Sequence, residues 1–538
     1  MDATLHPESA DPRRTPRASS APLPSASAPP LHRRARSAVP ARTGSLSPVT
    51  ETLNSPAQTD EVIARRNRLV IGLLLVSAFV VILNETIMGV ALPALEEDLG
   101  ISTSTGQWLT TAFMLTMAVV IPITGFLIQR LHTRTLFLTA MSLFTAGTLI
   151  AAAAPGFEVL LTGRIVQATG TAVMMPLLMT TVMTLVPAER RGRTMGTTSI
   201  VISVAPALGP TISGAILSAL EWRWMFIVML PLAVAALILG AVRMQNVTEP
   251  RPGRIDVLSV ILSAFAFGGL IYGLSSLGEA AAHGGEILMP PAVPIVVGAL
   301  ALAAFVARQL LLQRQDRALL DLRVFRSGNF SIALGMLLIS MMALFGTLIV
   351  LPLYLQQVLL LDPLVAGLVL LPGGIVMAVM SPFVGRLFDK FGPRALLVTG
   401  SIIVSAVLWS MTMLTETTPV WIVPIGHSLL SAGLALLFTP LFTSALGSVQ
   451  PRFYSHGSAV VSTLQQVAAG AGTALFITML TVATAAATTA NGGETGLAQA
   501  AEGMRAAFLC GGIISLFAIG MAFFVRKPAN EVAAGAGH

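Results

Sequence analysis

The chain has 538 residues, of which 54% are hydrophobic and 11% are charged. Soluble domains carry about 25% charged residues, so this composition excludes an ordinary soluble protein. The formal net charge of +7 comes from Lys and Arg residues that flank apolar segments, which is typical of membrane topology and indicates no nucleic-acid partner.

Residues 1–60 contain no long apolar segment and are rich in Pro, Ser, Ala and Arg. A segment of this composition cannot bury enough apolar surface to fold, so we expect a disordered cytoplasmic tail. Its Arg and Ser content also suits an organelle transit peptide, but the acidic residues Asp2, Glu8 and Asp11 weigh against that interpretation. An alternative role for the tail is contact with anionic lipid.

Fourteen apolar blocks follow the tail. A helix needs about 20 apolar residues to cross a hydrocarbon core about 30 Å thick. The blocks lack the alternating pattern of barrel strands, so they predict an all-α integral membrane protein. The predicted spans are 69–92, 107–128, 135–154, 158–184, 195–219, 224–244, 256–277, 291–312, 329–353, 364–384, 395–415, 419–446, 458–485 and 506–525.

Nearly all basic residues beside the spans fall on one side of the predicted membrane. By the positive-inside rule this side is cytoplasmic, so we expect both termini in the cytoplasm of a multi-pass protein of the cell membrane. The Ala, Gly and Arg bias of the chain favours a bacterial source. The opposite loops are mostly acidic, with Arg223 and Arg505 as the exceptions.

The chain contains an internal repeat. GRLFDKFGPR (385–394) follows span ten and GFLIQRLHTR (125–134) follows span two, an offset of 385 − 125 = 260 residues. Both strings begin with Gly, keep a basic sixth residue and end in Arg. This pattern predicts two six-helix bundles related by pseudo-twofold symmetry, at 61–245 and 326–527, joined by two linker transmembrane helices at 246–325. A cytoplasmic tail would follow at 528–538.

Five motifs together resemble the major facilitator superfamily, and within it the fourteen-span drug:proton antiporters. GRLFDKFGPR is similar to the family's cytoplasmic loop motif, and LLTGRIVQATG (160–170) is similar to its fourth-span motif. APALGPTISG (205–214) resembles the antiporter motif of span five. LNETIMGVALP (83–93) resembles the first-span motif, and WRWMF (222–226) resembles the start of span six. The resemblance covers nearly everything from 61 to 527.

The resemblance implies roles for two groups of residues. The loop motif would form a cytoplasmic gate that holds the ends of spans ten and eleven together, through Gly385, Asp389, Lys390, Gly392 and Arg394. The antiporter helix motif would seal the cavity against leak, through Gly209, Pro210 and Gly214. A solvated charge cluster and ordinary helix packing, respectively, are the alternatives.

The chain also departs from the family. Asn84 occupies the usual position of an Asp, and the acid is displaced by one residue to Glu85, a rotation of about 100° on a helix. The first loop motif has Gln129 where the family has an acid and His132 where it has a Gly, so only Asp389 keeps the full motif.

Glu85 is the only acid well inside a predicted span. A charge at mid-bilayer costs about 2.5–3.5 kcal/mol on insertion scales and is functional by default. We therefore expect proton coupling at Glu85 and Arg164, with a structural ion pair as the alternative. If Glu85 proves structural, Asp256 at the start of span seven is the next candidate.

Arg164, Gln167 and Thr171 share one helix face at i, i+3 and i+7. This polar stripe predicts a water-filled substrate cavity, which Asn84 would also line, unless Arg164 snorkels outward to the interface. Further cavity candidates lie in other spans: His427, Gln356 and Gln357.

Energy and cofactor requirements follow from what the sequence lacks. No phosphate loop of the form G-x-x-x-x-G-K-[ST] occurs, so the proton gradient is the expected energy source. The single cysteine, Cys510, is a packing residue, and we expect no metal, no cofactor and a monomer.

These observations favour a proton-coupled antiporter that exports amphipathic drug-like compounds by alternating access. Its partners would be a small-molecule amphipathic substrate, protons and the lipid bilayer. One alternative is a dedicated exporter of one endogenous metabolite, such as an antibiotic, a siderophore or a lipid. A channel would need charge rings or carbonyl filters, and a membrane enzyme would need clustered His, Asp or Glu at a membrane face; neither pattern is visible, so we expect no enzyme.

Overall fold

The computed structural model describes residues 56–250, 253, 255–283, 289–492 and 496–528. These residues form long α-helices and no strand, and fourteen of the helices are long and apolar enough to cross a membrane. The prediction of an all-α protein with fourteen spans is thereby confirmed. The predicted tails lie mostly outside the described residues, although Pro56–Asp60 belong to the first helix.

The helices run in chain order through the two predicted bundles and the linker pair. The first six are α1 (Pro56–Leu99), α2 (Thr103–Arg130), α3 (Thr133–Ala152), α4 (Phe157–Leu185), α5 (Arg191–Leu217) and α6 (Arg223–Arg243). The linker pair is α7 (Val257–His283) and α8 (Ala292–Leu312). The last six are α9 (Gly328–Leu353), α10 (Pro363–Phe391), α11 (Pro393–Met411), α12 (Ile422–Gly447), α13 (Tyr454–Ala490) and α14 (Leu497–Ala522).

Local sequence sets several helix ends. Ser102 and Ser327 accept backbone N–H groups of the first turns of α2 and α9, as N-cap residues do. Pro363 and Pro393 begin α10 and α11, where a missing N–H costs nothing. Gly392 ends α10 with a positive φ of 75°, a conformation that glycine adopts without strain.

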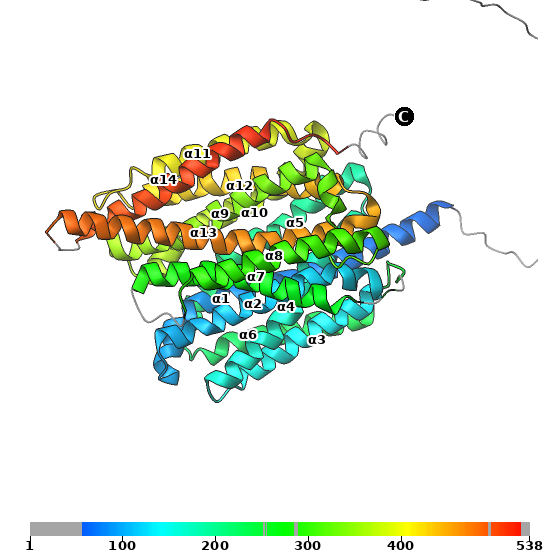
Figure 1. The fold of residues 1–538 in the computed structure, drawn as a ribbon, viewed down its shortest axis with the longest axis horizontal. Helices are drawn as coiled ribbons and strands as arrows, with labels where there is room; N and C mark the ends of the chain where they lie inside the picture. Colours follow the sequence, from blue (N-terminus) through cyan, green and yellow to red (C-terminus); the bar gives the residue numbers. More distant parts are fainter. Residues whose placement is uncertain (1–55, 251–252, 254, 284–288, 493–495, 529–538) are drawn as a thin grey trace, which may run out of the picture. The chain divides into compact units, whose positions relative to one another are not determined.

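The linker pair lies at the junction of the two predicted bundles. α3 packs on α4 in the first bundle, and α11 packs on α12 in the second. The bundles meet where α5 packs along α10 and where α2 packs along α13. These two interfaces correspond in the repeat, because the repeat relates α2 to α10 and α5 to α13. α7 packs against both α2 and α13, so the linker helices lie between the bundles (Figure 1).

An ion pair clamps the linker helices together. Arg308 on α8 donates from Nε and Nη2 to the two carboxylate oxygens of Asp256, at 2.7 and 2.6 Å. The backbone N–H and hydroxyl of Ser259 also donate to Asp256. The hydrogen bonds from Arg308 hold the pKa of Asp256 well below its usual range. Asp256 is therefore a fixed structural anion, which argues against the reserve role in proton coupling considered for it.

The beginning of α1 and the end of α14 lie at the same end of the helices (Figure 1). The loops on this side carry most of the arginines, including Arg130, Arg134, Arg190, Arg191 and Arg452. We call this side the basic face and the opposite side the acidic face.

Candidate functional site

The Asn84–Glu85–Thr86 stretch lies inside α1, where that helix packs against α5. The Thr86 hydroxyl donates to the backbone oxygen of Ala205 on α5, at 3.2 Å. Gly209 makes this approach possible, because an added Cβ there would lie 2.8 Å from the Cβ of Thr86. One turn of α1 is therefore fixed against α5 next to the carboxylate of Glu85.

Arg164 of α4 is the centre of a buried polar network. Its Nη1 donates to the side-chain oxygens of Gln167, at 2.7 Å, and of Asn84, at 3.3 Å. Its Nε donates to the backbone oxygen of Leu109, and its guanidinium carbon lies 4.1 Å from the ring centroid of Phe113. Every one of these partners is uncharged, so Arg164 is held without an ion pair.

The burial of this network corrects one prediction. Arg164, Gln167 and Thr171 are 1%, 0% and 5% exposed, so the polar stripe does not face a water-filled cavity in this conformation. Gln167 instead donates to the Thr148 hydroxyl of α3, at 2.8 Å. The snorkelling alternative for Arg164 is wrong as well, because its guanidinium points into the bundle.

Glu85 differs from its neighbours in having no fixed partner. It is partly buried, and its charge interacts with that of Arg164. Among the described residues, however, no hydrogen bond or ion pair to the Glu85 carboxylate is present. Its protonation state can therefore change without breaking a hydrogen bond of the native structure.

The antiporter helix motif lies on a continuous helix. α5 runs from Arg191 to Leu217 and passes through Gly209 and Pro210 without a break. The two glycines of the motif differ in surroundings, since an added Cβ at Gly214 would meet nothing within 4 Å. Gly209 is thus a contact to α1 beside Glu85, and Gly214 is not a close contact.

The remaining cavity candidates do not join this network. His427 of α12 packs against Gly373 of α10, where an added Cβ would lie 2.6 Å from its Nε2. The Nδ1 atom of His427 is buried and has no hydrogen-bond partner. Gln356 and Gln357 are exposed in a single wide helical turn, Tyr354–Val358, that follows α9.

The predicted gate residues lie at the basic face, where α10 of the second bundle meets α5 of the first. Asp389 near the end of α10 accepts the backbone N–H groups of Gly192 and Arg193, at 2.8 and 2.9 Å. These groups belong to the first turn of α5, where free N–H groups favour a carboxylate. We expected Asp389 to link spans ten and eleven, and that partner was wrong, because its hydrogen bonds go to the other bundle.

The other gate-motif residues surround this contact. Gly385 permits close packing, because an added Cβ would lie 2.9 Å from the backbone carbon of Gly192. Lys390 and Arg394 are exposed and lie over the rings of Phe391 and Phe523. Neither cation is paired with Asp389 within the described part of the chain.

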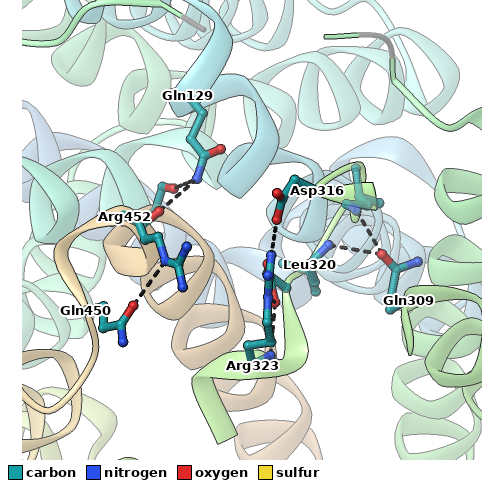
Figure 2. Close-up of polar contacts among 10 residues, drawn as sticks. Gln129, Gln309, Asp316, Leu320, Arg323, Gln450 and Arg452 are labelled. Atoms are coloured by element: carbon teal, nitrogen blue, oxygen red, sulfur yellow. Dashed lines mark hydrogen bonds and ion pairs between the residues drawn. The ribbon is translucent and has the colours of Figure 1, made fainter. Parts of the chain in front are cut away.

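Gln129 makes the corresponding contact in the other half of the repeat. Its position is related to Asp389 by the same offset of 389 − 129 = 260 residues. The Gln129 amide donates to the Ser455 hydroxyl, at 2.8 Å, and to the backbone oxygen of Arg452, at 3.4 Å (Figure 2). The two predicted gates, α10–α5 and α2–α13, both join the end of one helix to the start of a helix in the opposite bundle. Asp389 accepts backbone N–H groups, whereas Gln129 donates to oxygens, and only the α10–α5 gate has a carboxylate in the loop motif.

Sequence reasoning missed two contacts that join the bundles farther from the basic face. Thr439 of α12 donates to the Ser199 hydroxyl of α5, at 2.9 Å. Gln466 of α13 lies 3.9 Å from the sulfur of Met117 on α2. A polar residue inside an apolar span is the feature that could have revealed these contacts. Gln466 shows this feature more clearly than Thr439 and Ser199 do.

The chain is similar in sequence to a known protein family and to several bacterial proteins. The sequence model of the Major Facilitator Superfamily matches residues 74–473. The uncharacterized MFS-type transporter YcnB of Bacillus subtilis is 42% identical over 462 residues, covering 85% of this chain and 95% of that protein. The lincomycin resistance protein LmrB of Listeria monocytogenes is 41% identical and covers 85% of this chain and 96% of its own length. The multidrug resistance protein B homolog of Mycobacterium tuberculosis is 29% identical, with coverages of 74% and 73%.

Solved structures show the same fold at low sequence identity. The human organic anion transporter MFSD10 (TETRAN) superposes with a TM-score of 0.61 at 15% identity, covering 85% of this chain and 99% of its own. The proton:xylose symporter XylE superposes with a TM-score of 0.59 at 14% identity, with coverages of 88% and 99%.

Proposed function

Because the chain belongs to the major facilitator superfamily, whose members are membrane transporters and not enzymes, we propose that it exports amphipathic drug-like compounds in exchange for protons. Export of drugs is supported by the names of its relatives, which include lincomycin resistance and multidrug resistance proteins. Alternating access is supported by the two-bundle fold, in which substrate sites lie between the halves.

The main support for proton coupling is that Glu85 lies inside a membrane span without a fixed partner among the described residues. A membrane-embedded carboxylate needs either a fixed partner or a function. Arg164 supplies positive charge nearby but directs its donors to Asn84, Gln167 and the backbone of Leu109. Glu85 is thus close enough to a cation to be stable when charged and is free enough to be protonated.

The proposed exchange follows from competition for this one carboxylate. Burial favours the neutral acid, whereas a nearby cation favours the anion. A proton that binds Glu85 removes its charge, and a cationic amphipathic substrate binds only when that charge is present. Because both ligands cannot occupy the carboxylate together, each half of the transport cycle carries one of them.

We expect the basic face to be cytoplasmic, as the positive-inside rule predicts. The Asp389 contact to α5 and the Gln129 contact to α13 would then close the cytoplasmic side in this conformation. Opening toward the cytoplasm would require both contacts to break.

The test compares Glu85→Gln with Glu158→Gln. Gln keeps the size of the side chain and removes its charge, and Glu158 is an exposed acid at the start of α4 that serves as the matched control. In proteoliposomes, a pH gradient should drive drug transport by the parental protein and by Glu158→Gln. Glu85→Gln should insert normally and show only the transport of protein-free vesicles.

Substrate-induced proton release from the purified protein gives a second measurement. The release should disappear in Glu85→Gln and persist in Glu158→Gln. Full gradient-driven transport by Glu85→Gln would show that Glu85 is structural. A susceptibility panel in a deletion strain separates multidrug export from export of one endogenous metabolite. Loss of resistance to several unrelated compounds supports multidrug export. Loss of a single endogenous product from the medium supports a dedicated exporter.

A further inference from the structure

The segment between α8 and α9, residues 313–327, is packed into the basic face. We call this segment the connector. It contains two short helical turns, Gln313–Gln315 and Leu322–Arg326. Between and within them, five residues are at most 6% exposed: Ala318, Leu319, Leu320, Asp321 and Val324. A simple covalent link between two bundles needs no such burial, so the connector has a defined place in the closed structure.

Hydrogen bonds attach the connector to the linker helices at one end. The side-chain oxygen of Gln309 on α8 accepts the backbone N–H groups of Leu319 and Leu320, at 2.8 and 3.3 Å. The Gln309 amide nitrogen donates to Ser259 of α7, at 2.8 Å. Figure 2 shows Gln309 bound to Leu320 beside the connector. Gln309 is fully buried, so these bonds are shielded from water.

At its other end the connector touches the short helical turn Pro451–Phe453, which leads directly into α13. The guanidinium of Arg323 lies 5.0 Å from the ring centroid of Phe453, and the guanidinium of Arg452 lies 4.6 Å from the same centroid. The connector therefore supports the turn that presents the Arg452 carbonyl and the Ser455 hydroxyl to Gln129.

An internal ion pair holds this end of the connector in shape. Arg323 donates from Nε to Oδ1 of Asp321, at 2.9 Å, and from Nη2 to Oδ2, at 2.6 Å. The two side chains are 19% and 4% exposed. Arg323 also forms an ion pair with Asp316, so one guanidinium binds two carboxylates (Figure 2).

The connector brings these two carboxylates to the gate whose loop motif has lost its acid. The α10–α5 gate uses Asp389, whereas its counterpart in the α2–α13 gate is the neutral Gln129. Asp321 and Asp316 bring negative charge from outside the repeat, because both are bound to Arg323, whose guanidinium shares the Phe453 ring with Arg452 of the α2–α13 gate. The connector joins the linker helix α8 to the first helix of the second bundle, α9.

We propose that the connector is part of the gate at the basic face, with Asp321 and Arg323 as positioning residues that take over the role of the acid missing at position 129. The inference rests on alternating access under the proposed function. The connector keeps the start of α13 in place while the gate is closed, and it leaves the α13 surface when α2 and α13 separate.

A buried thiol reports this gate directly. Cys510 is the only cysteine of the chain, so Cys510→Ala with Ser462→Cys gives one reactive residue and leaves the Gln129–Ser455 bond intact. Ser462 lies on the same face of α13 as Ser455, two helical turns further on, and is 8% exposed, so a water-soluble maleimide should label Cys at this position slowly while the gate is closed. Labelling is measured on purified full-length protein without substrate or pH gradient, so its result is independent of whether Glu85 couples protons.

Neutralising the ion pair should open the gate more often. We expect Asp321→Asn and Arg323→Gln to raise the labelling rate about fivefold or more, the lower limit of ordinary coupling between sites. Arg317→Gln is the matched control, because Arg317 is an exposed arginine of the same connector without an ion pair among the described residues. Equal labelling rates in Arg323→Gln and Arg317→Gln would overturn the proposal.

Two further measurements keep the test independent of the stability of a single variant. The double reversal Asp321→Arg with Arg323→Asp should restore slow labelling, since it returns the ion pair with its charges exchanged, and unchanged fast labelling would contradict the role of this pair in the gate. In the parental protein, hydrogen exchange of the backbone amides should give the same opening rate for residues 316–324 as for residues 452–456. Opening rates that differ between the two segments would show that the connector is not part of the gate.

Discussion

Two glycines of α5, Gly209 and Gly214, should respond differently to replacement by Ala. Gly209→Ala places a methyl group 2.8 Å from the Cβ of Thr86 and 3.1 Å from its backbone carbonyl carbon, so α5 or α1 must move. We expect a loss of stability of about 1–3 kcal/mol, the usual cost of overpacking. Gly214→Ala meets open space and should be neutral or stabilise the helix by up to about 1 kcal/mol.

The measurement for this pair is thermal unfolding in detergent together with gradient-driven transport. Gly209→Ala should lower the unfolding temperature and reduce transport, because it displaces the turn of α1 that carries Glu85. Similar unfolding temperatures for the two variants would mean that the approach of α5 to Thr86 carries no packing energy.

The chemistry of the candidate site was predictable only in part. The sequence singled out Glu85 and Arg164, because charged residues are rare in apolar spans. It also placed Arg164, Gln167 and Thr171 on one face of α4. Which surface that face meets depends on α3 and on Phe113 of α2, and helical periodicity contains no information about these neighbours. The expectation of a water-filled cavity failed for that reason.

The linker pair α7–α8 allows a prediction about pH. The hydrogen bonds from Arg308 lower the pKa of Asp256, so the folded protein favours the charged carboxylate more than the unfolded chain does. The resulting stabilisation is complete above the usual Asp pKa of about 3.9 and is lost as the pH falls through the lowered pKa. Asp256→Asn should therefore destabilise the protein at neutral pH, by about 1.5–3 kcal/mol for hydrogen bonds to a charged group.

The check is thermal unfolding of both proteins as a function of pH. The difference between the parental protein and Asp256→Asn should be constant at neutral pH and become smaller only in strong acid, below the usual Asp range. Asp362→Asn is the control, since Asp362 is exposed and its side chain makes no capping bond to α10. A difference that already shrinks near neutral pH would contradict the fixed ion pair.

Helices were predicted more reliably than their contacts. Each span appears as a continuous apolar block, because its length is set by the thickness of the bilayer. The partner of Asp389 could not be found in this way, because Gly192 lies 197 positions earlier in the chain. The repeat offered the only indirect signal, since Asp389 and Gln129 occupy equivalent positions and both bind a helix of the opposite bundle.

The orientation of the whole protein in the membrane follows from its charge distribution. We expect the basic face, and with it both termini, to be cytoplasmic. A reporter that is active only outside the cytoplasm should therefore be silent when fused after Lys527. The same reporter inserted after Glu416, in the loop between α11 and α12, should be active and serves as the positive control. Activity after Lys527 would overturn the topology and the proposed sidedness of the gate together.

The contact between Asp389 and α5 has a consequence for how this transporter tolerates mutation. The carboxylate binds backbone N–H groups, which every residue except proline provides. Arg193 can therefore be replaced by most other residues without loss of the contact. Gly192 cannot, because an added Cβ would lie 2.6 Å from the backbone oxygen of Gly385. Random variation at the start of α5 should thus be neutral at all but a few sites, and deep mutational scanning should find strong selection at Gly192 beside a permissive position 193.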